Sequence, residues 1–397
     1  MLNSTTLHIG YDAKRLFFNS SGLGNYSRTL VENVINHSEI DNNEIIKVSL
    51  FTHKQPRLNF ANKYPRIGNA ILNNGVSVIQ PHTLNPVWRT WGMGKSVQKN
   101  KIDVFHGLSN EIPQDLPKGI MSVVTIHDVL FKQIPKQYSW VDRKIYDYKT
   151  GYALKHATKV IATSKATANA INSYFSFPAS KIHVVYQSIQ SEFFKPILEL
   201  NQTEKSTITS EYISKIIATA PYIIYHSTFN YRKNHLRLLK AFNAIKDKVD
   251  FNLVLPGFMG HSWKTVNAYI NDNNLENRVS AMGEVSFNVL LVLLRNAKGF
   301  IYPSLNEGFG IPLAEAAAMK LPFMVSDIPV FKELIGLETE CLFKPDNINS
   351  ISQALMKLND GNIGQNLGAN WTNLHQSIID KTHPDQVAKQ LMEIYQL

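Results

Sequence analysis

The sequence is poor in the residues that mark several common classes of protein. It has one cysteine, Cys341, so an internal disulfide is excluded and a reducing cytoplasm is expected. No run of about 18 uncharged apolar residues occurs, so no membrane-spanning helix is expected. The first residues lack the basic and apolar regions of a signal peptide. With 20 glycines and 17 prolines, collagen-like and low-complexity classes are also excluded. We therefore expect a folded protein that works in the cytoplasm.

The length and the hydrophobic pattern predict two α/β domains. A chain of 397 residues is longer than a domain with one hydrophobic core usually is. In both halves, short apolar runs alternate with amphipathic helices. This alternation is typical of βα units with parallel sheets, so we expect two Rossmann-like, doubly wound domains with a cleft at the carboxyl ends of their strands. The expected strands are 7–11, 76–79, 104–106, 122–126 and 159–163, then 222–226, 251–255, 279–282, 299–302 and 322–325.

The expected boundaries follow from the loss of periodicity after residue 192. We place the first domain at 1–195, a linker region at 196–220, the second domain at 221–378 and a final helical segment at 379–397. That last helix carries an apolar stripe, which needs another surface to cover it. The stripe consists of Val387, Leu391, Ile394 and Tyr395.

Positive charge is concentrated in the first half of the chain. The formal net charge is +10, and residues 1–200 carry 23 basic and 13 acidic residues. The stretch 45–102 contains basic residues but no acidic one, which favours a surface that meets phosphate in a nucleic acid, an anionic lipid or an acceptor. Trp88, Trp91 and Met93 within it suit a bilayer interface. A solvated basic face, or a helix that buries both tryptophans, is the alternative.

The strongest local motif runs from residue 303 to residue 319. A strand ends, a loop turns through Gly308 and Gly310, and Pro312 stands where a first helical turn tolerates proline. The free N–H groups at this helix start favour a phosphate. Glu307 in the loop and Glu315 in the helix are expected to accept hydrogen bonds from sugar hydroxyls. A glycine-bearing turn with two solvated glutamates is the alternative.

A second motif follows the strand at 222–226. Arg232 and Lys233 are two cations at a strand's carboxyl end beside a helix start, which makes a diphosphate site. Asn234 is expected to cap that helix, and the hydroxyl of Ser227 to contribute a phosphate contact. An exposed basic pair is the alternative.

Three further loops end first-half strands. Gly22 and Gly24 open the first helix, so its N–H groups are expected to face the cleft, although such a turn is weak evidence alone. His127 and its neighbour Asp128 follow the strand at 122–126. The residues expected on the acceptor side are Asp12, Arg15, Tyr26, His106 and Asp128.

Motifs for metal or covalent chemistry are missing. The sequence has no H-E-x-x-H, no D-x-D triplet, no P-loop and no G-x-S-x-G. We therefore expect no metal and no other cofactor.

These motifs, in this order along nearly the whole chain, resemble the retaining glycosyltransferases of family 4, which have the GT-B fold. Glu307 and Glu315 match that family's E-x7-E arrangement. The resemblance implies that Glu307 contacts the transferred sugar, Glu315 binds the donor ribose, and Arg232 and Lys233 hold the diphosphate. It also implies that the last helix returns to the first domain. The implied catalytic residues are His127, Arg232, Lys233 and Glu307, and the implied donor-binding residues are Gly22, Gly24, Ser227, Arg232, Lys233, Gly308, Phe309, Gly310, Ile311 and Glu315.

The implied activity is transfer of a hexose from a nucleotide diphosphate sugar to a glycan or a lipid-diphosphate-linked acceptor, in bacterial surface polysaccharide synthesis. GDP-mannose is the favoured donor, and a UDP-sugar is the alternative. The basic stretch suggests a peripheral position on the cytoplasmic face of the inner membrane. A glycan phosphorylase of the same fold is an alternative, but the sequence lacks the cofactor lysine motif that such an enzyme needs. A nucleic-acid-binding protein would explain the charge but not the second-half motifs, so we expect no nucleic acid partner.

Overall fold

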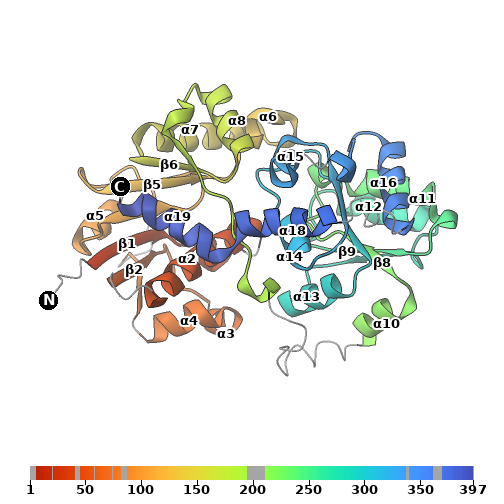
Figure 1. Ribbon diagram of the computed structural model, residues 1–397. Helices are drawn as coiled ribbons and strands as arrows, with labels where there is room; N and C mark the ends of the chain where they lie inside the picture. Colours follow the sequence, from red (N-terminus) through yellow and green to blue (C-terminus); the bar gives the residue numbers. More distant parts are fainter. Residues whose placement is uncertain are drawn as a thin grey trace. The chain divides into compact units, whose positions relative to one another are not determined.

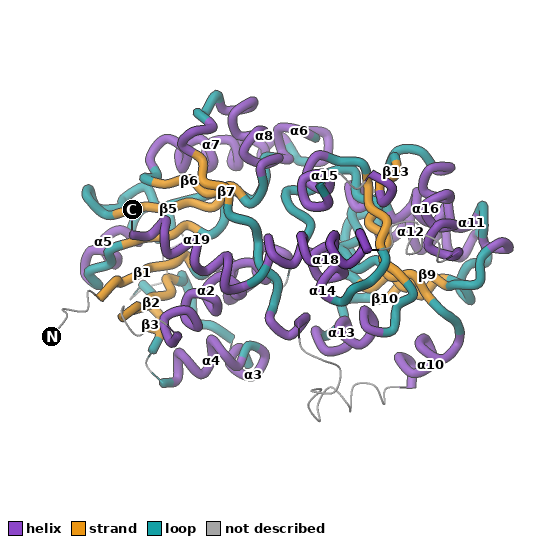
Figure 2. Tube along the Cα trace, in the orientation of Figure 1, coloured by secondary structure: helices purple, strands orange, loops and turns teal. Residues whose placement is uncertain are grey.

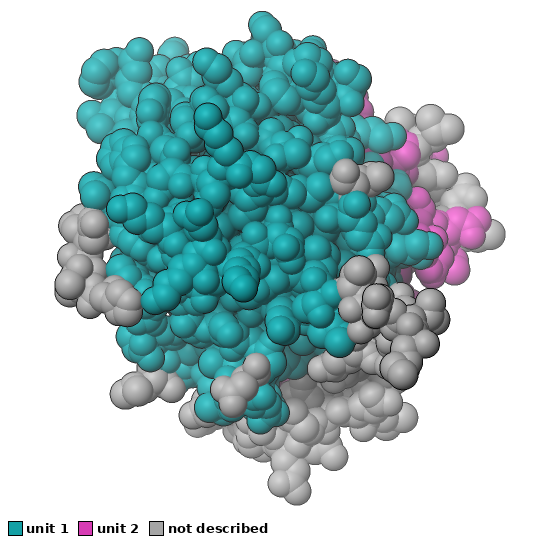
Figure 3. All heavy atoms as spheres, turned by 90° about the vertical axis from the view of Figure 1, so that its left-hand side faces the viewer, with its two compact units in different colours: residues 1–189, 381–397 teal, residues 190–380 magenta. Residues whose placement is uncertain are grey.

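The chain forms two compact units, which the computed structural model describes over residues 6–19, 21–40, 45–57, 59–73, 75–81, 87–194, 211–336, 339–360 and 369–396. Unit 1 consists of residues 1–189 and 381–397, and unit 2 consists of residues 190–380 (Figure 3). Each unit is a parallel sheet with helices (Figures 1 and 2). The expected pair of Rossmann-like units is therefore confirmed.

Unit 1 is built on a seven-stranded parallel sheet with the order β3-β2-β1-β4-β5-β6-β7. Its strands are β1 (Thr6–Asp12), β2 (Ile45–Phe51), β3 (Val76–Ile79), β4 (Val104–Gly107), β5 (Met121–Ile126), β6 (Lys159–Ala162) and β7 (Ile182–Val184). Its helices are α1 (Lys14–Phe18), α2 (Gly22–Ile40), α3 (Phe60–Lys63), α4 (Pro65–Leu72), α5 (Met93–Lys99), α6 (Leu130–Gln133), α7 (Trp140–His156), α8 (Lys165–Phe175) and α19 (Pro384–Gln396). The strand order reverses between β1 and β4, and such a switch point is where doubly wound sheets bind ligands.

Unit 2 has a six-stranded sheet with the order β10-β9-β8-β11-β12-β13. The strands are β8 (Tyr222–Ile224), β9 (Asn252–Pro256), β10 (Val279–Met282), β11 (Gly299–Tyr302), β12 (Phe323–Ser326) and β13 (Leu342–Phe343). The helices are α10 (Glu211–Thr219), α11 (His235–Asn243), α12 (Trp263–Asp272), α13 (Phe287–Arg295), α14 (Ile311–Ala318), α15 (Pro329–Ile335), α16 (Ile348–Asp360) and α18 (Ala369–Thr382). Its switch point lies between β8 and β11.

The last helix, α19, belongs to the core of unit 1. Its buried side chains Val387, Leu391 and Tyr395 join the cluster that contains Leu30 and Val34 of α2. The Tyr395 hydroxyl lies 2.7 Å from Nδ1 of His106 at the end of β4. Figure 1 shows α19 running alongside α2. The expected apolar stripe and its return to the first unit are therefore confirmed.

The structure differs from expectation in several elements. β2, β7 and β13 were not predicted, because β2 lies in the basic stretch and the other two have only three and two residues. Part of the expected linker, residues 211–219, is the helix α10, whereas residues 195–210 lie outside the described residues. The boundary that follows unit 1 falls after Ile189.

The basic stretch 45–102 does not present both tryptophans to solvent. Trp88 and Met93 are buried with Phe51 and Phe105 in a core cluster. A bilayer surface built on Trp88 and Met93 is therefore wrong, since burial against aromatic neighbours stabilises them more than exposure would. Of the three residues expected at a bilayer, only Trp91 is exposed. Among the described residues, no helix is long and apolar enough to cross a membrane.

Candidate active site

The candidate donor site lies at the switch point of unit 2, where two loops meet. One loop follows β8 and carries the short 3-10 turn Tyr231–Lys233, and the other follows β11 and carries residues 303–310. The two loops are joined by backbone, because the N–H of Leu305 donates to the carbonyl of Arg232 at 2.8 Å. Motifs that are about 70 residues apart in sequence therefore form one structure.

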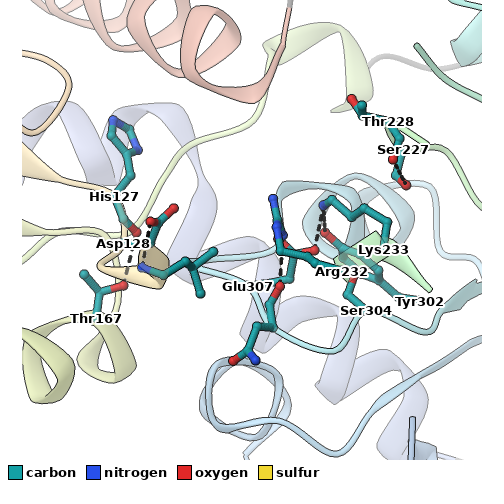
Figure 4. A network of polar contacts seen from close by, with 12 residues as sticks. His127, Asp128, Thr167, Ser227, Thr228, Arg232, Lys233, Tyr302, Ser304 and Glu307 are labelled. Atoms are coloured by element: carbon teal, nitrogen blue, oxygen red, sulfur yellow. Dashed lines mark hydrogen bonds and ion pairs between the residues drawn. The ribbon is translucent and has the colours of Figure 1, made fainter. Parts of the chain in front are cut away.

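Glu307 is paired with both cations of the other loop. Its Oε2 lies 2.6 Å from Nη1 of Arg232, and its Oε1 lies 2.6 Å from Nζ of Lys233. Figure 4 shows the three side chains pointing toward one another. Nη1 of Arg232 also donates to the carbonyl of Asn306 at 2.9 Å. One carboxylate thus holds two cations in place at the end of the strands.

The electrostatic effect on Glu307 is large. Burial alone would raise the pKa of its carboxyl, but Arg232 and Lys233 outweigh burial and lower that pKa to about 2. The carboxylate is therefore ionised at any physiological pH. The cluster carries one net positive charge, which suits a dianionic or trianionic diphosphate.

Two buried tyrosines, Tyr225 and Tyr302, contact Lys233. The Lys233 ammonium lies 5.4 Å from the centre of the Tyr302 ring, and the Tyr225 hydroxyl donates to the carbonyl of Lys233 at 3.0 Å. Ser304 Oγ lies 3.2 Å from the same hydroxyl. Because both tyrosines are buried, their positions are fixed by the core of unit 2.

Asn234 stands at the N-cap position of α11, as expected, but its side chain contacts the loops and does not cap the helix. Its backbone is in the left-handed region with φ 63°, and its side chain makes no capping hydrogen bond to α11. Instead Nδ2 donates to the carbonyls of Pro303 and Pro345, at 2.9 and 2.7 Å. A side chain turned toward those carbonyls cannot reach the first N–H groups of its own helix.

The helix α14 starts beside these loops, directly after its N-cap residue Gly310. The backbone of Gly310 has φ 124°, and a Cβ there would lie 2.7 Å from the Phe331 ring, so glycine is required. One turn into α14, Oε2 of Glu315 lies 2.5 Å from Nε2 of His226, which stands two residues beyond the end of β8. Glu315 is thus held near the carboxyl end of β8, with its carboxylate already engaged by a histidine.

The other expected donor residues surround this point. Gly308 and Ile311 lie in the loop and at the first position of α14, and the side chain of Phe309 is buried. Any contact of Phe309 with a phosphate must therefore use its backbone. Ser227 is half-buried, and its hydroxyl lies 3.4 Å from His235.

Unit 1 has an ion-pair network at its own switch point that the sequence did not reveal. Asp12 at the end of β1 is paired with Arg89, Nη2 of Arg89 lies 2.6 Å from Glu111, and Nζ of Lys149 lies 2.5 Å from Glu111. Burial would raise the pKa of Glu111, but Arg89 and Lys149 lower it to about 2. Asp12 was expected here, whereas its partners carry no local motif and come from distant segments.

His127 stands at the end of β5, as expected, but both its ring nitrogens are engaged within unit 1. Nε2 donates to the carbonyl of Leu108 at 2.8 Å, and Nδ1 accepts from Gln187 at 3.1 Å. Burial lowers its pKa to about 4, so the ring is neutral at pH 7. In this state the ring is not a proton donor toward a ligand. Oδ1 of Asp128 accepts from the N–H of Leu130 and so shapes the loop (Figure 4).

His106 and Tyr26 do not line an acceptor surface, so that expectation is wrong for both. His106 is fully buried between the hydroxyls of Tyr395 and Thr125, at 2.7 and 2.8 Å. Burial lowers the pKa of His106 to about 3. The Tyr26 hydroxyl lies 2.9 Å from the same Thr125, and its ring packs edge-on against His127. Both residues complete a buried polar network that also fixes α19.

The first turn of α2 packs closely against the residues before it. A Cβ at Gly24 would lie 1.8 Å from the carbonyl oxygen of Asn19, so glycine is required by close backbone approach. The N–H of Gly24 donates to the carbonyl of Ser21 at 2.9 Å. Gly22 is exposed, and Arg15 is half-buried with no hydrogen-bond partner for its Nε among the described residues.

Metal ligands are not grouped in the part of the chain that the structure describes. No cluster of three or more histidine, cysteine, aspartate or glutamate side chains suitable for a metal ion occurs there.

Two family models match the chain, one in each half. Residues 42–193 match the model of glycosyltransferase family 4, and residues 209–373 match that of glycosyl transferases group 1. The second match includes the whole Arg232–Lys233–Glu307 cluster and Glu315. The first includes Arg89, Glu111 and His127.

Individual proteins are similar to the chain over different lengths. The O-antigen chain mannosyltransferase B of Escherichia coli is 23% identical over 85% of this chain and 86% of its own. The O-antigen chain mannosyltransferase RfbU of Salmonella typhimurium is 28% identical over 53% of this chain and 54% of its own, so that match spans about half of each protein.

The fold has close counterparts among solved structures. A structure of Anabaena Alr3699/HepE in complex with UDP and glucose superimposes with a TM-score of 0.67 at 16% identity, covering 98% of this chain and 99% of that one. Two parallel-sheet units with a returning C-terminal helix are the architecture of the GT-B fold. The chain belongs to the family 4 glycosyltransferases and has the GT-B fold.

Proposed function

We propose that the chain transfers mannose from GDP-mannose to a hydroxyl of a glycan or lipid-diphosphate-linked acceptor, with retention at the anomeric carbon. The single observation that carries the proposal is the cluster of Arg232, Lys233 and Glu307 at the switch point of unit 2. A preformed pair of cations at a strand's carboxyl end suits a diphosphate, and a buried carboxylate beside them suits sugar hydroxyls.

The chemistry asked of these residues is mainly electrostatic. The bond from the sugar's anomeric carbon to the diphosphate oxygen breaks, and a bond to the acceptor oxygen forms on the same face. The acceptor proton passes to the leaving phosphate oxygen. Arg232 and Lys233 stabilise the charge that develops on the diphosphate, because they already stand in place before the reaction. Glu307 holds both cations and accepts a hydrogen bond from the sugar.

Mannose is supported by the two O-antigen chain mannosyltransferases to which the chain is similar. Those names also support a role in bacterial surface polysaccharide synthesis. The main alternative is a UDP-sugar donor, and the likeness to Alr3699/HepE with UDP and glucose favours it.

A donor panel tests the choice. GDP-mannose, UDP-glucose, UDP-galactose and UDP-N-acetylglucosamine are each incubated with the full chain, and release of the nucleotide is measured without an acceptor. We expect release from GDP-mannose only, since transferases slowly hydrolyse their own donor. Release from a UDP-sugar instead would replace mannose, and release from none of the four, with no nucleotide binding, would remove the transferase assignment.

Two further parts of the proposal have their own measurements. We propose that no metal is required, so donor hydrolysis should be unchanged after treatment with EDTA. The configuration of the new bond, read by NMR of the product, should be that of the donor; an inverted product would exclude a retaining route.

The acceptor is proposed to bind unit 1 near the switch point between β1 and β4, beside Asp12, Arg89 and Glu111. Polar groups of both signs suit hydroxyls and a phosphate in one acceptor. We place the protein in the cytoplasm, at the inner face of the inner membrane. Short oligonucleotides should not shift its melting temperature, whereas GDP should raise it; the reverse result would favour a nucleic-acid-binding protein.

A further inference from the structure

The helix α7 exposes an unusual number of large hydrophobic side chains. Trp140, Val141, Ile145 and Tyr148 are 64%, 56%, 44% and 60% exposed. At 3.6 residues per turn, these four side chains fall within one arc of about 140° on the helix surface. Single exposed hydrophobic residues are ordinary, but a contiguous set on one helix face marks an interaction surface.

The opposite face of α7 is firmly packed, so the exposure does not come from a loose helix. Thr150, Ala153 and Leu154 are buried, and the last two belong to the core cluster of β5, β6 and α8. The helix begins at a proper cap, because the Ser139 side chain accepts from the N–H of Asp142 at 3.0 Å. The hydrophobic face is therefore a rigid part of unit 1.

The charges on the exposed arc are all positive. Lys144 and Lys155 fall among the hydrophobic side chains, and both are exposed. Lys144 Nζ lies 5.9 Å from the centre of the Trp140 ring. Within α7 the two acidic side chains lie outside the arc or at its edge, and both are engaged: Asp142 by the Ser139 hydroxyl at 2.7 Å and Asp147 by Lys132 at 2.6 Å.

Trp91 extends this surface beyond the helix. It is 57% exposed, and its Nε1 donates to the side chain of Gln114 at 3.0 Å. Nε2 of Gln114 in turn lies 3.1 Å from the Tyr148 hydroxyl. The indole of Trp91 is thus linked through one amide to the aromatic face of α7.

We propose that this surface, named here the α7 face (Trp91, Trp140, Val141, Lys144, Ile145, Tyr148 and Lys155), docks on an anionic lipid bilayer. Tryptophan and tyrosine rings are amphipathic and sit at headgroup level, while lysines between them meet anionic headgroups. Charge complementarity assigns the occupant, because the only charges within the arc are cations and a lipid surface offers anionic headgroups across the whole face. This proposal rests on the proposed function, since docking would bring unit 1 to a lipid-linked acceptor. Binding to lipid is nevertheless measured without sugar transfer, so the two can fail separately.

Co-sedimentation of the full chain with vesicles tests the proposal. One set of vesicles is phosphatidylcholine, and the other is equal parts phosphatidylcholine and phosphatidylglycerol, each at low and high salt. We expect binding to the anionic vesicles, weakened by salt, and little binding to the neutral ones. Absence of binding to both would overturn the proposal.

Matched variants locate the surface. Ile145→Glu and Trp140→Ala should each weaken binding to anionic vesicles roughly tenfold or more. Leu72→Glu is the control, because Leu72 is 70% exposed on a different helix, α4. It should bind as the wild type does. Equal binding by all three variants, or loss of binding on Lys47→Glu with Lys63→Glu while the α7 variants still bind, would place docking elsewhere and overturn the proposal.

Two measurements keep docking distinct from folding and from the reaction. Melting temperature and donor hydrolysis by Ile145→Glu should match the wild type, since the α7 face lies in unit 1 and the donor cluster in unit 2. Sedimentation velocity without lipid should give the same mass for both proteins. A wild-type dimer that becomes a monomer in Ile145→Glu would assign the face to a second copy of the chain instead.

Discussion

Nζ of Lys233 lies 2.6 Å from Oε1 of Glu307, although 73 residues separate them along the chain. The contact joins the carboxyl ends of β8 and β11, the two strands at which the sheet order of unit 2 reverses. The cation is therefore held in position by a carboxylate that burial would otherwise make costly to ionise. This preorganisation is the basis of the first two predictions.

Glu307→Gln should lower transfer by about 10²–10³, the usual cost of about 2.7–4 kcal/mol for one lost preorganised charge contact. It should also lower the melting temperature, because the variant leaves Arg232 and Lys233 side by side without their shared counter-charge. Glu284→Gln, at an exposed glutamate, is the control for both measurements. Near-native transfer by Glu307→Gln would remove this residue from the reaction.

Lys233→Ala should lower the transfer rate by a similar factor, since the ammonium is expected to stabilise the leaving diphosphate. The nucleotide affinity of the variant, measured by calorimetry with GDP, should also fall. Lys264→Ala removes an exposed lysine elsewhere in unit 2 and should leave both quantities unchanged. A variant at position 233 with full affinity and rate contradicts the diphosphate assignment.

Glu315→Gln is expected to raise the donor KM about tenfold with less change in kcat, if its carboxylate binds the donor ribose. The loss of charge also weakens the contact with His226. Steady-state kinetics with varied donor separates the two constants, and Glu276→Gln, at an exposed glutamate, serves as the control. A fall in kcat at unchanged KM would move Glu315 from the ribose to the reacting sugar.

Deletion of the residues after Thr382 should destabilise unit 1. The truncated chain loses the buried side chains of Val387, Leu391 and Tyr395 and leaves His106 without one of its two hydrogen-bond partners. Each buried large apolar side chain contributes about 1.5–3 kcal/mol. Differential scanning calorimetry should therefore show a lower transition temperature for unit 1, and an unchanged one would contradict the packing of α19.

The pH dependence of stability should reflect buried neutral histidines. Burial lowers the pKa of His106 to about 3 and that of His127 to about 4, whereas an unfolded histidine has about 6.5. Between those values the unfolded chain binds protons that the folded chain does not, so stability is fully present above pH 6.5 and is lost as the pH falls. Each residue contributes up to about 1.4 kcal/mol per pH unit.

The variant His106→Gln tests that dependence. Urea unfolding between pH 7.5 and 5 should show a shallower loss of stability in this variant than in the wild type. His156→Gln, at an exposed histidine, should keep the wild-type slope. Identical slopes in all three proteins would contradict a neutral buried His106.

The fold was largely predictable from the sequence, because local hydrophobic patterns indicate most of its strands and helices. Runs such as 299–302 are apolar throughout, as expected for strands buried on both faces. β2 was not predicted, because Lys47 and Ser49 interrupt its apolar run within a stretch that is rich in cations.

The side chains of the candidate site were predictable only in part. Arg232, Lys233 and Glu307 sit in loop motifs, so spacing alone indicated them, and the structure brings them together. Arg89 and Glu111 lie in no sequence motif. Their ion pair joins two segments that only the fold brings together, so the sequence alone could not indicate it. The expectation that His106 lines the acceptor side was wrong, because its position at the end of a strand does not reveal that Tyr395 covers it.

The place of α19 has a consequence for synthesis on the ribosome. Residues 384–396 complete the core of unit 1, yet they are translated after all of unit 2. All of unit 2 is therefore synthesised first, and the apolar surface of α2 that α19 covers stays open until residues 384–396 have been made. The usual order, in which the N-terminal domain finishes folding first, is reversed here, and for that interval the nascent chain offers a binding site for chaperones.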